Sequence, residues 1–191
     1  MFVFDREQLD LIALRIIAQL EHLQARLVLA ESCTGGEMAA AFTRIPGASG
    51  SFCGSFVTYR PTSKIEWLGV NKHIIKEHTA ESQQTANAMA ITALEKTPEA
   101  NVSLAAVGHL EPPGQRMPPF VIAAVGLRTA INVNGGINVL TEANQALVAD
   151  DRAQRQYEAC AIVLRYLYTG INDQQVMKTI QDVVAARHSA S

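Results

Sequence analysis

Ser32 lies in the segment of this chain that is best suited to chemistry, Ala30-Glu31-Ser32-Cys33-Thr34-Gly35-Gly36. The segment follows a short apolar run and precedes a predicted helix. At such a junction the backbone N–H groups and the helix dipole favour an anion or a developing oxyanion. A purely structural alternative exists, because Thr34 and Glu37 have the spacing of a capping box. A cap by Thr34 leaves Ser32 unexplained, which favours a functional segment.

A serine becomes a nucleophile only when a neighbouring base takes its proton. None of the five histidines lies in a triad motif, there is no G-x-S-x-G elbow, and only His109 falls in a candidate active-site loop. The other available activator is a lysine whose pKa is lowered by burial, with a tyrosine hydroxyl as relay. Tyr59 and Lys64 follow the second predicted strand, where both can face the end of the first strand.

Other kinds of site lack their signatures. The sequence has neither HExxH nor clustered histidines and cysteines, so we expect no metal site. Gly35-Gly36 is not followed by Lys-Ser or Lys-Thr, and GxGxxG is missing, which argues against a P-loop and a dinucleotide fold. The net charge of −2 and the scattered lysines and arginines argue against nucleic-acid binding.

The composition predicts one globular domain that spans residues 1–191. Hydrophobic residues make up 48% and charged residues 18% of the chain, which is a globular composition. Three scattered cysteines indicate a reducing compartment rather than a disulfide framework. We expect a cytoplasmic protein without a membrane span, since the N-terminus has no leader pattern and no apolar run reaches 18 residues.

The hydrophobic pattern predicts alternating strands and helices. Asp5 is the expected N-cap of the first helix, and Ser63 and Glu66 have capping-box spacing around a short helix. Residues 108–119 are rich in proline and glycine and are expected to form a loop. Helices are predicted over about 6–24, 35–44, 64–68, 81–94, 150–168 and 173–187, and strands over 27–30, 51–59, 102–107, 120–129 and 131–141. This order predicts an α/β fold, a three-layer α/β/α sandwich with a mixed, mostly parallel sheet.

Several motifs of the sequence resemble those of the CinA C-terminal-domain family, which includes the nicotinamide-nucleotide amidohydrolases. The resemblance covers residues 8–169, in a stand-alone form with an extra helix at 172–187. It rests on the segment around Ser32, on Ile45-Pro46-Gly47-Ala48-Ser49, on Gly54-Ser55-Phe56-Val57-Thr58-Tyr59 with Lys64, on Ile65-Glu66-Trp67-Leu68-Gly69-Val70, and on Asp150-Asp151-Arg152 with Arg155.

The resemblance implies an amidase that converts nicotinamide mononucleotide to nicotinate mononucleotide and ammonia. It makes Ser32 the nucleophile, Lys64 the general base and Tyr59 the hydroxyl that assists proton transfer. The substrate-binding residues that it implies are Thr34, Gly35, Gly36, Gly108 and Arg152, although Arg152 also fits a helix-start salt bridge. It implies no metal or organic cofactor, a small-molecule substrate and a homo-oligomer.

The chain departs from the family pattern at Glu111, where the family typically has a glycine. A glutamate adds bulk and a negative charge that repels a phosphate at close range. The alternative interpretation is therefore a catalytically altered or inactive paralogue that binds a nucleotide-like or other small ligand. A third is an interaction protein whose helix 173–187 packs on a partner chain rather than on its own domain.

Overall fold

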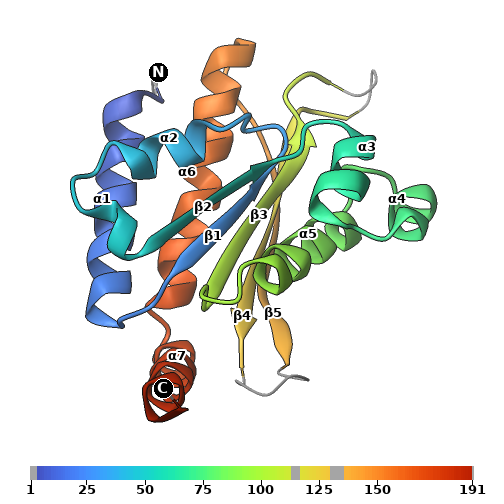
Figure 1. Ribbon diagram of the computed structural model, residues 1–191. Coiled ribbons are helices and arrows are strands. Elements are labelled where there is room, and N and C mark those ends of the chain that lie inside the picture. Colours follow the sequence, from blue (N-terminus) through green and yellow to red (C-terminus); the bar gives the residue numbers. More distant parts are fainter. Residues whose placement is uncertain (1–3, 113–116, 130–135, 191) are drawn as a thin grey trace.

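The computed structural model describes residues 4–112, 117–129 and 136–190, and its centre is one five-stranded sheet (Figure 1). The sheet has the order β2-β1-β3-β4-β5, formed by β1 (Leu27–Glu31), β2 (Phe52–Val57), β3 (Val102–His109), β4 (Phe120–Arg128) and β5 (Ile137–Ala146). β1 pairs in parallel with both β2 and β3, while β4 is antiparallel to β3 and β5. Within the described ranges β4 therefore opposes the direction of the other strands, which confirms the mixed, mostly parallel sheet.

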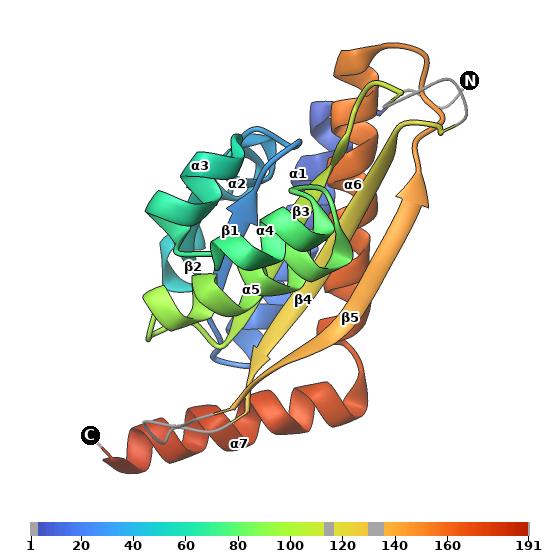
Figure 2. The ribbon, with the colours of Figure 1, turned by 90° about the vertical axis from the view of Figure 1, so that its right-hand side faces the viewer.

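Helices cover both faces of the sheet, as the three-layer prediction requires (Figures 1 and 2). One layer holds α1 (Arg6–His22), α2 (Glu37–Thr43) and α6 (Arg152–Ile171), and the other holds α3 (Pro61–Ser63), the π-helical turn η2 (Lys64–Leu68), α4 (Lys72–His78) and α5 (Gln83–Lys96). A short 3-10 turn, η1 (Ala48–Gly50), precedes β2. The last helix, α7 (Gln174–Ala190), lies across the end of the sheet where β1 and β3 begin.

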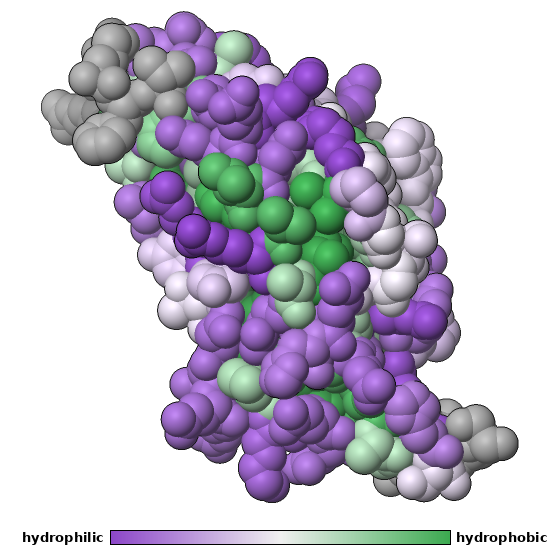
Figure 3. Space-filling view, turned by 90° about the vertical axis from the view of Figure 1, so that its left-hand side faces the viewer, coloured by the Kyte–Doolittle hydropathy of each residue, from purple (hydrophilic) through white to green (hydrophobic). Residues whose placement is uncertain are grey.

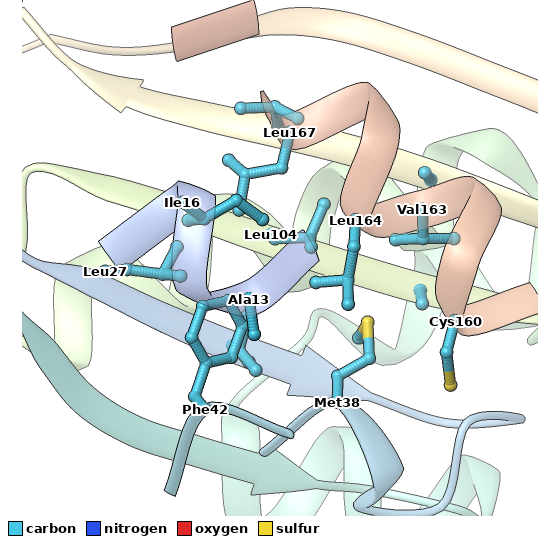
Figure 4. Close-up of a cluster of buried hydrophobic side chains, with 14 of the residues drawn as sticks. Ala13, Ile16, Leu27, Met38, Phe42, Leu104, Cys160, Val163, Leu164 and Leu167 are labelled. Carbon is cyan, nitrogen blue, oxygen red and sulfur yellow. The ribbon is translucent and has the colours of Figure 1, made fainter. Parts of the chain in front are cut away.

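The apolar run at Leu27 is a strand because both of its faces are buried. Leu27 and Leu29 belong to the core under α1, α2 and α6, whereas Val28 and Ala30 belong to the core under α5. Side chains alternate across a strand, so a strand covered on both faces has to be apolar throughout. Figure 4 shows the larger core, where Met38, Phe42 and Leu164 meet side chains of α1 and of the sheet.

Three helix starts are capped by side chains of the expected kind. Asp5 accepts a hydrogen bond from the Gln8 N–H, and Ser82 and Asp151 accept in the same way from the N–H groups three residues further on. Such caps satisfy N–H groups that have no partner inside the helix. The predictions for the first helix and its N-cap are confirmed.

Some predicted boundaries are wrong for physical reasons. Ser63 does not start a helix with Glu66; its Oγ accepts from the Arg60 N–H and donates to the Arg60 carbonyl, so the helix begins at Pro61. The helix α4 was not predicted. Gly108 and His109 extend β3 instead of opening a loop, because they pair with β4. β5 begins at Ile137 and ends at Ala146, later than expected; residues 130–135, where the prediction began, and 113–116 of the predicted loop lie outside the described residues.

Gly108 has a packing reason to be glycine. A Cβ at this position would lie 2.2 Å from the carbonyl oxygen of Phe120 and 2.9 Å from the Cα of Val121. The main chain of β4 occupies that space and cannot give way as a flexible side chain does. The glycine is therefore required by the pairing of β3 with β4, whatever its part in binding a substrate.

The outer face of α1 exposes apolar side chains. Leu11 is 61% exposed and Leu14 is 49% exposed, and Figure 3 shows hydrophobic surface in the middle of this side of the molecule. Exposed apolar patches are typical of interaction sites, but nothing in the structure identifies a partner, so the homo-oligomer stays a prediction. No helix among the described residues is long and apolar enough to cross a membrane.

A matched pair of leucine substitutions tests the described packing. Leu164 is fully buried between α6 and α1, so Leu164→Ala should lower the free energy of unfolding by about 2–5 kcal/mol. Leu11→Ala removes the same atoms from an exposed position and should change it by less than about 0.5 kcal/mol. Urea denaturation of both variants measures the difference, and equal effects would contradict the packing.

Candidate functional site

The candidate site lies at the carboxyl ends of β1 and β2. Ser32 follows β1 directly, and its N–H donates to the carbonyl of Ala106 on β3. Tyr59 comes two residues after β2. The chain runs from β1 to β2 on one side and then crosses to β3 on the other, so β1 is a topological switch point of the parallel part of the sheet. Ligands of open α/β sheets bind at such points.

The structure brings Ser32 and Lys64 into direct contact. The Lys64 Nζ lies 2.8 Å from the Ser32 Oγ, 2.9 Å from the Thr58 carbonyl oxygen and 3.5 Å from that of Tyr59. Ser32 is 4% exposed and Lys64 is fully buried. A neutral amine has two N–H groups for the carbonyls and one lone pair for the serine hydroxyl. The three contacts also match the three N–H groups of an ammonium, so the geometry fits either protonation state, and in the neutral form the lone pair can accept the serine proton.

Burial lowers the pKa of Lys64 from its ordinary value, because the ammonium loses its water. The carboxylate of Glu81 opposes this effect. A lowered pKa raises the fraction of neutral lysine near pH 7, and the neutral form is the one that can act as a base.

Cys33 is the neighbouring alternative nucleophile, and its environment argues against it. Burial raises the pKa of the Cys33 thiol to about 12. Only the thiolate is a strong nucleophile, so almost no reactive form exists at neutral pH. The adjacent Ser32, in contact with an amine, is the better candidate.

Glu31 holds the segment around Ser32 in place, a role that the sequence analysis did not assign to it. Its fully buried carboxylate accepts from the N–H groups of Gly36, Met38 and Ala39, at 3.0, 3.3 and 2.9 Å, and from the Ser55 hydroxyl at 2.9 Å. The chain therefore places its own anion at the start of α2. This explains the position of Ser32, which is held between a fixed strand end and a capped helix.

The capping box of Thr34 and Glu37, the structural alternative to a functional segment, does not form. The N-cap of α2 is Gly36, and no side chain of the capping-box pair caps the helix; the buried Thr34 Oγ1 has no hydrogen-bond partner among the described residues. Glu31 caps from the end of β1, and it precedes the N–H groups that it binds by five to eight residues, a wider separation than that of a capping box. A capping-box motif involves only residues in the first turn of the helix.

The backbone amides of the segment are not all available to a ligand. The N–H of Gly35 donates to the Ser32 carbonyl at 3.1 Å, and that of Gly36 donates to Glu31. The N–H groups of Cys33 and Thr34 donate to no main-chain carbonyl in the described chain; they lie near the Cys33 sulfur and lower its pKa, against the larger effect of burial. Of the amides of residues 33–36, these two donate to no carbonyl or carboxylate in the described chain.

Gly35 is also constrained by α6. Its φ of +63° is left-handed, and a Cβ would lie 2.9 Å from the Gln156 Nε2, which donates to the Thr34 carbonyl. Glycine permits both the backbone conformation and the close approach. Gln156 thus ties the segment to α6, and no sequence signal indicated it.

Tyr59 and Arg152 are in contact at the rim of the site. The sequence analysis did not predict this contact. The Tyr59 hydroxyl, on a side chain that is largely exposed, lies 3.1 Å from the Arg152 Nη2. Among the described residues no hydrogen bond joins this hydroxyl to Ser32 or Lys64. The proton-relay role of Tyr59 stays a prediction.

Glu111, the residue at which the chain differs from the family pattern, pairs with Arg152 and Arg155 at the start of α6. Its carboxylate lies 3.8 Å from the Arg152 Nη1 and 3.1 Å from the Arg155 Nη1. Arg155 is fixed in addition by the carbonyls of Ala149, Asp150 and Leu110. The negative charge of Glu111 is thus compensated inside the chain, which a sequence comparison alone could not show.

The remaining predicted residues lie around this centre. Gly108 is on β3, and the neighbouring His109 places its Nε2 3.7 Å from the Glu81 carboxylate and its ring edge-on to Phe120. Thr34 and Gly36 follow Ser32 in the turn that leads into α2. Within the described ranges no three histidine, cysteine, aspartate or glutamate side chains are grouped to hold a metal ion.

Known proteins resemble this chain along most of its length. A family model described as the CinA C-terminal domain matches residues 10–171. A CinA-like protein of Chlorobium phaeovibrioides is 31% identical over 156 residues, which are 82% of this chain and 36% of that protein. One of Chlorobium luteolum is 32% identical over 165 residues, or 84% and 36%. The chain spans little more than a third of the length of these relatives.

A solved structure gives the same result. The crystal structure of the competence/damage inducible protein from Agrobacterium tumefaciens is 30% identical, with a TM-score of 0.75 over 91% of this chain and all of that one. A second likeness, to a CinA superfamily protein from Escherichia coli, has 27% identity and a TM-score of 0.67 over 83% of this chain and 89% of that one.

The buried amine makes stability depend on pH. The pKa of Lys64 is lower in the folded protein than its ordinary value of 10.5. Between these two pKa values the unfolded chain binds more protons, so the free energy of unfolding rises with pH. Lys64→Met binds no proton in either state. We expect the wild type to gain stability relative to this variant as the pH rises toward 10.5, measured by urea denaturation from pH 7.

The control for this experiment is Lys178→Met, which removes a lysine whose side chain is 78% exposed. The difference in the free energy of unfolding between this variant and the wild type should stay constant over the same pH range. An equally constant difference for Lys64→Met would show that the folded protein does not perturb Lys64.

Proposed function

The chain belongs to the CinA C-terminal-domain family, and on this premise we propose that it is an amidohydrolase of the nicotinamide-nucleotide type. The reaction converts the carboxamide of nicotinamide mononucleotide to a carboxylate and releases ammonia. One observation carries the proposal: the buried Nζ of Lys64 lies 2.8 Å from the Oγ of Ser32. This geometry is that of a nucleophile and its base.

The first half of the reaction forms an acyl-enzyme. The Ser32 Oγ attacks the amide carbon while its proton passes to the Lys64 Nζ, and the carbonyl oxygen becomes an oxyanion. The amides of Cys33 and Thr34 are the donors that we assign to that oxyanion. The tetrahedral intermediate collapses when Lys64 returns the proton to the nitrogen, which leaves as ammonia.

The second half releases the acid. Water attacks the Ser32 ester as Lys64 takes one of its protons, and a second oxyanion forms at the same donors. When that intermediate collapses, the Ser32 oxygen leaves and takes the proton back from Lys64. Both halves need an amine that is neutral at the start, which the burial of Lys64 supports.

The charged residues at the rim of the site bear on how much negative charge a substrate can carry. Arg152 and Arg155 are the cations that a substrate phosphate would meet, and Glu111 already pairs with both. The pair of Glu111 with Arg152 joins two exposed side chains, and exposed ion pairs are weak, about 0–1 kcal/mol. A phosphate can therefore compete with Glu111 for Arg152 but binds less well than it would without Glu111. We propose that Glu111 biases the site toward amides with little negative charge.

The second candidate is a paralogue that binds a nucleotide-like ligand without turnover, and the Glu111 pairing is the observation that favours it. A binder is stabilised against heat by its ligand and releases no product. Stabilisation by nicotinamide mononucleotide without ammonia release would select this alternative.

Ammonia release tests the nucleophile and its base. With nicotinamide mononucleotide or nicotinamide as substrate, we expect Ser32→Ala and Lys64→Met each to lower kcat by about 1000-fold or more, because they act as one unit. Ser49→Ala, an exposed serine outside the site, should keep full activity. Tyr59→Phe should lose much less than Ser32→Ala if the contact with Arg152 is its main role. Full activity of Ser32→Ala would refute the proposal.

Glu111→Gln tests the substrate bias. Removing the charge should lower KM for nicotinamide mononucleotide by about 3- to 10-fold, as expected from one nearby charge near a protein surface, and leave KM for uncharged nicotinamide unchanged. Glu21→Gln makes the same charge change on the exposed side of α1 and is the control. Equal changes for both substrates would mean that Glu111 does not select by charge.

A further inference from the structure

A carboxylate and an imidazole lie beside the Ser32–Lys64 pair and have no part in the proposed mechanism. Glu81 directly precedes Ser82, the N-cap of α5, and His109 is the last residue of β3. Their side chains meet, with the Nε2 of His109 3.7 Å from the Glu81 carboxylate. The end of β3 thus carries an acidic group that the chemistry of the nucleophile and its base does not use.

Both side chains lie on the same face of the sheet as the nucleophile. Ser32 donates its N–H to β3 and continues the parallel register of β1, which places it level with Val107. His109 is two residues further along β3, so strand spacings put the Cα atoms of Ser32 and His109 about 8 Å apart. Val107 faces α5, and His109 faces the same way because side chains alternate along a strand. Lys64 comes from this layer too, since η2 packs against α5 (Figure 1).

Glu81 contributes a negative charge that no lysine or arginine pairs with in the described part of the chain. Only 26% of its side chain is exposed, and the one basic group within ion-pair distance among those residues is His109, which is charged only when it is protonated. The carboxylate raises the pKa of Lys64, against the larger effect of burial. By contrast, the charge of Glu111 is balanced by two arginines of α6.

A carboxylate in this place is unfavourable for the hydrolysis of an uncharged amide. It stabilises the ammonium form of Lys64, which cannot act as a base, and it repels the oxyanion that forms when Ser32 attacks. A positive charge on the substrate would cancel both effects. In a pyridinium carboxamide the cationic nitrogen belongs to the ring that carries the reacting amide, so its charge enters the site together with that amide.

We propose that Glu81 is a specificity-determining residue that makes the site select carboxamides on a cationic ring, such as N-alkylated pyridinium carboxamides. The inference rests on the proposed function and names the substrate class of the same site. Glu81 acts from the α5 side of the sheet, whereas Arg152 and Arg155 belong to α6 on the other side. The two sides of the site thus differ in charge, and a cationic ring is matched to the first of them.

Ammonia release from nicotinamide and from 1-methylnicotinamide tests the selection. The first ring is neutral and the second is cationic, and neither compound has a phosphate to meet the arginines. At about pH 8 histidine is ordinarily uncharged. We expect Glu81→Gln to lower kcat/KM for 1-methylnicotinamide by about tenfold relative to nicotinamide, an effect between those of one charge in water and inside a protein. The intrinsic reactivity of each amide cancels, because each is compared between wild type and variant.

Two further variants control for effects other than charge. Glu77→Gln makes the same change at an exposed carboxylate four residues earlier and should leave the ratio of the two substrates unchanged. Glu81→Asp keeps the charge and should keep most of the selection. An unchanged ratio in Glu81→Gln would overturn the proposal. So would an equal loss of kcat for both substrates, because the carboxylate would then act in the reaction itself or in folding.

Calorimetric titration separates this inference from the proposed function. If the wild type releases ammonia from neither compound nor from nicotinamide mononucleotide, the amidase proposal fails, and selection is measured by binding instead. We then expect the wild type to bind 1-methylnicotinamide about tenfold more tightly than nicotinamide, and Glu81→Gln to bind the two equally. Equal binding of both compounds by the wild type, or binding of neither, would overturn the role of Glu81.

Discussion

The contact between the Lys64 amine and the Ser32 hydroxyl is the constraint on which the site depends. A buried ammonium is unfavourable unless it is paired or loses its proton. Here the neighbours are a hydroxyl and main-chain carbonyls rather than a carboxylate in contact, and burial lowers the pKa of the amine from its ordinary value. The carbonyl of Thr58 belongs to the chain leaving β2, and Ser32 to the chain leaving β1. The amine can be satisfied only if these two parallel strands end side by side.

A second buried ionisable group, Glu31, fixes the other side of the nucleophile. Its carboxylate is satisfied by three N–H groups and one hydroxyl, which is the pattern of an ionised acid at a helix start. Glu31 directly precedes Ser32. Its hydrogen bonds fix the turn into α2, and they occupy the Gly36 N–H, which is then not available to a ligand. The segment therefore has separate tasks for adjacent residues: Glu31 holds the backbone, Ser32 faces the amine, and the Cys33 thiol stays protonated.

The sheet separates two regions of different chemistry. The carboxyl ends of β1 and β2 carry the Ser32–Lys64 pair, whose rim is formed by ion pairs from α6. The beginning of β1 and of β3, covered by α7, borders a polar pocket in which Arg26 pairs with Glu99. The strand β1 runs from one region to the other. It is fully buried because helices cover both of its faces.

The sequence by itself determined the layer architecture, because patterns of burial repeat locally: apolar runs become strands covered on both faces, and stripes of period 3.6 become helices. It also allowed Tyr59 and Lys64 to face the end of the first strand, and the resemblance to the family joined them with Ser32. The tertiary structure decided which of them touch. Lys64 meets Ser32, while the Tyr59 hydroxyl meets Arg152, and Glu31 rather than Thr34 caps α2. These pairings join residues from different elements, and the choice among partners depends on distances and burial that no spacing along the chain encodes.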